Sequence, residues 1–236
     1  MNKSNLETNT RWNNFYKFAA IASLLIVLVG LVDIVTSMLG GEAQENSAVN
    51  IVDWFNLFQT NRLAALGNLG LFNILTLSLG IPLYLALFNI HRQTQPAFGI
   101  LAFVLFVMGT GIYISSNTVF SMLALSDQYA VATEVQKPLL EAAGRALLAQ
   151  GADLTPGTFM GFFFTQTAAM LMAFVLLQGR VFSKITAWLG VAGFGLMLIF
   201  FFIAAFMPDQ FVTALMISAP GGLLLMAYQI LLARRL

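Results

Sequence analysis

Five polar side chains lie inside or at the edge of long apolar stretches, and their types could support chemistry. They are Asp33, Arg62, Asn73, Asn117 and Gln166. Asp33 is the only acidic residue inside an apolar stretch, and a carboxylate in lipid costs roughly 2.5–3.5 kcal/mol even on insertion scales. It therefore needs a proton or a partner. Arg62, at the same expected depth on the next stretch, is the partner that we expect.

The Asp33–Arg62 pair has three interpretations from the sequence. It could be an ion pair that pins two helices together, a site for an ion, a proton or a solute, or a pair of charges exposed to a water-filled vestibule. Asn73, Asn117 and Gln166 would add hydrogen bonds at the same depth. Each of these amides alone is explained by a helix-to-helix hydrogen bond worth about 0.6 kcal/mol. Their convergence with the charged pair predicts a site for a small polar or amphipathic ligand.

The elements that must position these residues are membrane-spanning helices. The chain of 236 residues is 59% hydrophobic and only 9% charged, whereas soluble domains have about 25% charged residues. A bilayer core about 30 Å thick requires roughly 20 apolar residues per helix. The pattern therefore predicts an all-α polytopic membrane bundle, a single transmembrane domain over residues 1–236. Its six transmembrane helices are expected at about 18–39, 62–90, 98–123, 158–178, 185–207 and 211–232.

Two outer loops are predicted to contain short amphipathic helices on the membrane surface, at about 51–60 and 128–150. In the second segment, apolar residues recur at helical spacing, and Pro138 and Gly151 suit the beginning and the end of a helix. In the sixth span, Pro220, Gly221 and Gly222 predict a kink, because proline removes a backbone hydrogen bond. A broken helix that forms a binding site, as in many transporters, is the alternative.

The distribution of basic residues predicts the orientation of the chain. If both termini are cytoplasmic, eight of the 11 basic residues lie inside, and three lie outside: Arg62, Lys137 and Arg145. This asymmetry follows the positive-inside rule and agrees with an even number of spans.

Several classes of function are not expected from the composition. A net charge of +1, with cations spread along the chain, argues against nucleic-acid binding. The chain has no cysteine and one histidine, His91, so we expect no metal site and no cofactor. His91 is predicted to be a solvated cap at a helix end. A lipid-modifying intramembrane enzyme would need acids paired with a histidine, or a nucleophile with a base, and is therefore not expected.

Three stretches carry a resemblance to a known family: LYLALFNIHR (83–92), SNTVFSMLALSDQYAVATEVQKPLLEAAGRALLAQG (116–151) and VFSKITAWLGVAG (181–193). They resemble a bacterial family of six-span integral membrane proteins that is described only as a domain of unknown function. The resemblance implies the six-span fold and the cytoplasmic (inner) membrane of a prokaryote. It implies no activity, substrate or site residue.

Two functions fit these observations. The first is a non-enzymatic transporter or sensor that holds a small ligand in the outer half of the bundle. The alternative is an accessory or scaffold subunit that packs against another membrane protein or a second copy of the chain. The lipid bilayer is the partner that the sequence requires in either case.

Overall fold

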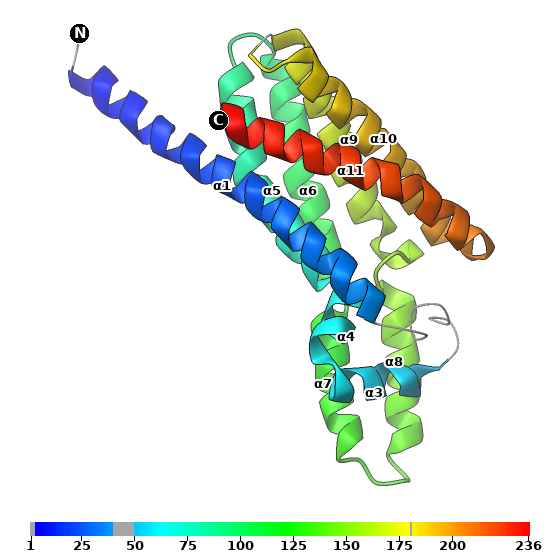
Figure 1. Ribbon diagram of the computed structural model, residues 1–236. Coiled ribbons are helices and arrows are strands. Elements are labelled where there is room, and N and C mark those ends of the chain that lie inside the picture. The colour runs from blue at the N-terminus through cyan, green and yellow to red at the C-terminus, as the bar shows by residue number, and fades with distance from the viewer. Residues whose placement is uncertain (1–2, 40–49, 180) are drawn as a thin grey trace.

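The computed structural model of this protein describes residues 3–39, 50–179 and 181–236. These residues form an all-helical bundle without a strand, which confirms the predicted fold class (Figure 1). Six helical segments are long and apolar enough to cross a membrane. Their membrane-crossing helices are α1 (Lys3–Leu39), α5 (Leu71–His91), α6 (Pro96–Ser116), α9 (Pro156–Gly179), α10 (Lys184–Phe206) and α11 (Phe211–Arg235).

A lobe projects from one end of this bundle, and α1 begins and α11 ends toward the other end (Figure 1). The lobe consists of four shorter helices: α3 (Ile51–Thr60), α4 (Arg62–Asn68), α7 (Val119–Ala130) and α8 (Lys137–Gly151). Helices α6 and α7 together run from Pro96 to Ala130, which is 35 residues or about 52 Å at 1.5 Å per residue. Because the apolar core of a bilayer is about 30 Å thick, about 20 Å of this segment extends beyond it.

The lobe has an apolar core of its own. Asn50 caps α3, its side chain accepting a hydrogen bond from the Val52 N–H at 3.2 Å. The buried face of α3, with Trp54, Phe55 and Phe58, packs against α7 and α8. Helices are confirmed at 51–60 and, within 128–150, at Lys137–Gly151. Helices α7 and α8 pair with each other and with α3 (Figure 1), and their position on the membrane surface stays a prediction.

Three predicted spans differ from the helices at one boundary each. The predicted first span, 18–39, lies within α1, which already begins at Lys3. The predicted second span, 62–90, is broken after Asn68, and the crossing helix begins only at Leu71. The predicted third span, 98–123, ends at Ser116, because Asn117 is extended. The fourth to sixth spans agree with the prediction within about three residues at each end.

Helices α6 and α9 of the bundle pack closely against each other at glycine residues. A Cβ added to Gly161 on α9 would lie 2.6 Å from Tyr113 Cβ on α6, and one added to Gly109 on α6 would lie 2.8 Å from the Thr165 N on α9. Such contacts are typical of membrane helices, whose backbones approach closely at small residues.

The sixth crossing helix is continuous through the proline and glycine motif. Helix α11 includes Pro220, Gly221 and Gly222 without interruption, so the alternative of a broken helix is wrong. A Cβ on Gly221 would lie 3.2 Å from Leu196 Cβ of α10, whereas one on Gly222 would meet open space. Gly221 therefore serves helix packing; the kink stays a prediction.

Candidate functional site

Three helix breaks meet where the lobe joins the bundle. They separate α4 from α5 at Leu69 and Gly70, α6 from α7 at Asn117 and Thr118, and α8 from α9 at residues 152–155. A break leaves backbone carbonyls without intrahelical partners, and such groups must be paired near the membrane. Asn117 Nδ2 donates to the Leu69 carbonyl at 2.8 Å, and the Thr118 N–H donates to the Gly151 carbonyl at 3.1 Å. The breaks therefore pair with one another.

Asp153 is the centre of the polar cluster at this junction. Its carboxylate accepts hydrogen bonds from Asn73 Nδ2 at 2.7 Å and from the Tyr113 hydroxyl at 2.8 Å. Asn117 Nδ2 also lies 3.3 Å from that hydroxyl. The structure thus brings together two predicted site residues, Asn73 and Asn117, through two residues that the prediction did not include. Tyr113 shares a helical face with Asn117, which was a usable signal; Asp153 lies in a polar loop that carries none.

Gly70 allows this cluster to form. Its φ of +98° lies in the left-handed region that favours glycine. A Cβ at this position would overlap the Tyr113 hydroxyl and would lie 2.8 Å from Asn117 Nδ2. The Gly70 carbonyl accepts a hydrogen bond from Tyr113 at 3.4 Å. The break before α5 is therefore shaped to fit the side chains of α6.

Asp33 approaches the cluster from α1. Asp33 lies one turn before Thr36, whose hydroxyl donates to the Asp33 carbonyl at 3.0 Å, and its carboxyl group is within electrostatic range of Asp153. Thr36, one helical turn further along α1, lies against α4, where a Cβ on Gly67 would be 3.1 Å from Thr36 Oγ1. Within the described residues, no side chain or N–H group donates a hydrogen bond to the Asp33 carboxylate. Two acids from separate segments thus lie near each other at the membrane edge.

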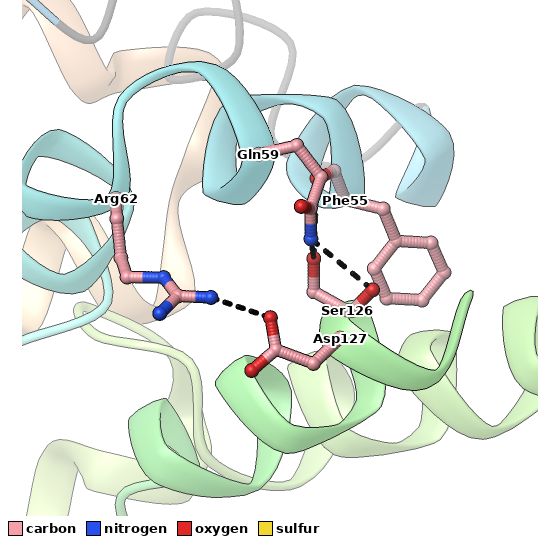
Figure 2. A network of polar contacts seen from close by, with 5 residues as sticks. All are labelled: Phe55, Gln59, Arg62, Ser126 and Asp127. Carbon is pink, nitrogen blue, oxygen red and sulfur yellow. Dashed lines mark hydrogen bonds and ion pairs between the residues drawn. The ribbon is translucent and has the colours of Figure 1, made fainter. Parts of the chain in front are cut away.

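Arg62 does not pair with Asp33, so this prediction is wrong. Arg62 begins α4 in the lobe, and its Nη2 lies 2.5 Å from Asp127 Oδ1 of α7, with both side chains about half exposed. Figure 2 shows this pair, which joins α4 to α7, beside a contact that joins α3 to α7: Gln59 Nε2 donates to Ser126 Oγ at 3.2 Å. The physical reason is the break after Asn68, which separates Arg62 from the membrane-crossing helix α5.

Two further amides at or below the junction have unpaired atoms. Both side-chain atoms of Asn68, the last residue of α4, are buried without a hydrogen bond, and so is Gln166 Oε1 on α9. Asn68 lies between Gly67, which contacts Thr36, and Leu69, which accepts from Asn117. Gln166 was predicted to join the site, but no described hydrogen bond connects it with the Asp153 cluster.

The single histidine is also placed differently from the prediction. His91 is fully buried, its Nδ1 lies 2.9 Å from the Leu87 carbonyl, and its ring stacks on Phe182 at 5.9 Å between centroids. It packs inside the bundle instead of capping a helix in solvent, so this prediction is wrong. It lies at the end of α5 away from the lobe and takes no part in the Asp153 cluster.

The junction can bind a ligand through its carboxylate and amide groups. Among the described residues, the ion pairs are Arg62–Asp127, Lys137–Glu134 and Arg145–Glu141, so neither Asp33 nor Asp153 is neutralised by a basic side chain. The described part of the chain holds no group of three or more potential metal-ligating residues. The junction therefore presents two acidic groups and an unpaired amide, a combination that attracts positive charge.

Comparison of the chain with protein-family models, with curated proteins and with solved structures finds no match. The resemblance to a six-span bacterial family accordingly stays a prediction, and the chain is, from its own structure, an all-helical multi-pass membrane protein.

Proposed function

We propose that the protein binds a small, positively charged ion or solute at the junction between the lobe and the bundle, as a transporter or a sensor does. The observation that carries this proposal is the Asp153 carboxylate at the junction, held by Asn73 and Tyr113 at 2.7 and 2.8 Å, with Asp33 on α1 as a second acid and no basic partner for either from the described residues. An unpaired carboxylate at membrane depth is costly, at roughly 2.5–3.5 kcal/mol. A bound cation offsets that cost, which a neutral or anionic ligand does not do.

The surrounding groups suit such a ligand. Asn73 and Tyr113 already hold the Asp153 carboxylate in one orientation, at 2.7 and 2.8 Å, so little ordering is needed when a ligand binds. The Asn68 side chain adds a buried oxygen and a buried nitrogen without partners. Because Arg62 lies in the lobe and not beside Asp33, the expected charge of the ligand changes. A site with Asp33 and Arg62 would have no net charge, whereas a site with Asp33 and Asp153 is acidic and favours a positively charged ligand.

The proposed location of the site is the side of the inner membrane that faces away from the cytoplasm. The basic residues Lys17, Arg92, Lys184, Arg234 and Arg235 belong to the bundle end opposite the lobe. The positive-inside rule assigns that end to the cytoplasm, so the lobe and the junction would meet solutes from outside, consistent with a prokaryotic transporter or sensor.

The test measures the stability of the purified full chain with a panel of cations: sodium, potassium, calcium, choline and putrescine, all as chlorides at matched ionic strength. We expect at least one of them to raise the free energy of unfolding in a saturable way, by about 2.7 kcal/mol at one hundred times its Kd. Asp33→Asn should abolish this response. Without any cation, the same variant should be at least as stable as the wild type, because it removes an unneutralised charge.

Arg62→Gln is the matched control, because it removes a charge from the lobe and leaves the junction intact; it should respond to the cation as the wild type does. If Asp33→Asn also responds fully, or if no cation has a saturable effect, the proposal fails. Absence of any response would favour the accessory-subunit alternative. For that function the lobe offers exposed apolar side chains at its tip, namely Val131, Val135 and Leu139.

A further inference from the structure

A groove lies at the end of the bundle opposite the lobe, between the residues that begin α10 and those that end α11. Figure 1 shows these two helix ends on the side away from the lobe. This open surface groove has a volume of about 500 Å³. Ser183, Thr186, Arg234 and Arg235 supply its polar lining, and Val181 and Phe182 supply apolar lining. The groove thus combines two guanidinium groups with hydroxyl groups and an apolar wall.

The charge of this groove is strongly positive. Arg234 and Arg235 are exposed in the last turn of α11, and neither pairs with an acid of the described chain. Arg235 Nε donates to the Val181 carbonyl at 3.3 Å, so its side chain lies along the groove. The acidic residues whose side chains the structure describes all belong to the lobe, the junction or the turn before α11: Asp33, Asp53, Asp127, Glu134, Glu141, Asp153 and Asp209. The described charges of this groove therefore favour an anion as its ligand.

The neighbouring side chains indicate the depth of the groove in the membrane. On α10, within one turn of the groove, Ile185 is 70% exposed and Trp188 is 57% exposed. A large apolar side chain exposed on a membrane-crossing helix faces lipid, and tryptophan is enriched at the level of the lipid headgroups. The two arginines therefore lie at headgroup depth, beside the acyl chains of the surrounding lipid.

The beginning of α10 adds to the attraction of an anion. Ser183 Oγ accepts a hydrogen bond from the Thr186 N–H at 3.1 Å, which makes Ser183 the N-cap of the helix. The positive end of the α10 dipole consequently faces the groove on the same side as the arginines. Arginine also matches phosphate geometry through paired N–H donors.

We propose that this groove binds the phosphate-bearing headgroup of an anionic phospholipid. Basic pockets between membrane helices at the cytoplasmic side hold such headgroups, and the lipid-facing Ile185 and Trp188 leave room for the acyl chains beside the groove. Arg234 and Arg235 supply the charge, and Ser183 lies at the groove wall. The inference does not depend on the cation site, because the two sites are at opposite ends of the bundle.

The test is a lipid titration of the full chain in zwitterionic detergent, with bound lipid counted by native mass spectrometry. The probes are dioctanoyl phosphatidylglycerol, dioctanoyl phosphatidylcholine and inorganic phosphate. We expect the wild type to bind phosphatidylglycerol at least tenfold more tightly than phosphatidylcholine. Each arginine near a membrane surface is worth about 1 kcal/mol, so the variant Arg234→Gln/Arg235→Gln should bind phosphatidylglycerol roughly 10- to 30-fold more weakly.

The matched control is Lys17→Gln/Arg92→Gln, which removes the same charge from exposed positions at the same end that do not line the groove; binding should change less than about threefold. Arg234→Gln alone leaves the Arg235–Val181 hydrogen bond intact and should weaken binding about fivefold, which keeps the test decisive if the double variant folds poorly. Equal losses in the control and the groove variant would overturn the proposal. Displacement of phosphatidylglycerol by 10 mM inorganic phosphate would overturn the assignment to a lipid.

Discussion

Gly70→Ala is expected to lower the free energy of unfolding by about 3–5 kcal/mol. Alanine at a φ of +98° is strained, at a cost of about 1–3 kcal/mol. The added Cβ also overlaps the Tyr113 hydroxyl and crowds Asn117, and overpacking of this kind costs about 1–3 kcal/mol more. The measurement is reversible unfolding of the purified chain from mixed micelles with sodium dodecyl sulfate.

The matched control for this substitution is Gly111→Ala, on the neighbouring helix α6. A Cβ at Gly111 meets no atom within 4 Å, and its φ is not in the left-handed region. The free energy of unfolding of the Gly111→Ala variant should therefore differ from that of the wild type by less than about 1 kcal/mol. If the two variants lose similar amounts of unfolding free energy, the positive φ of Gly70 and its close contact with Tyr113 contribute nothing specific. The proposed fit between the α4–α5 break and Tyr113 would then be refuted.

Asp153→Ala is expected to cost about 2–4 kcal/mol of stability in the same assay. The substitution leaves Asn73 Nδ2 without an acceptor and leaves the Tyr113 hydroxyl only its longer contact with the Gly70 carbonyl, at 3.4 Å. Each buried polar group left unpaired costs about 1–3 kcal/mol. Asp153→Asn keeps one acceptor oxygen and should lose less than Asp153→Ala.

Asp127→Ala provides the comparison, because it removes a carboxylate from a half-exposed ion pair with Arg62. Exposed ion pairs contribute about 0–1 kcal/mol, so its loss should be small. If Asp153→Ala is as mild as Asp127→Ala, the Asp153 cluster does not hold the three helix breaks together. Asp153 would then be a solvated loop residue, as its place in the sequence suggested.

The six long apolar helices of the described chain followed from the sequence alone. Hydropathy is a property of each stretch by itself, so runs such as 158–178 and 185–207 identified α9 and α10 within about three residues. The helix at 51–60 was also predicted, as a short amphipathic segment in an outer loop. The polar character of Asn73 and Asn117 within apolar stretches was likewise visible, and both belong to the junction.

The partners of the polar groups were decided only by the tertiary structure. Arg62 and Asp127 are 65 residues apart in the chain, and Asn73 and Asp153 are 80 residues apart. Whether such groups meet depends on where each long helix breaks, and a break at Gly70 moves Arg62 from the membrane into the lobe. Local sequence does not determine these breaks. A break leaves backbone carbonyls unpaired, and near the membrane it is stable only when side chains of other helices donate hydrogen bonds to them, as Tyr113 and Asn117 do here.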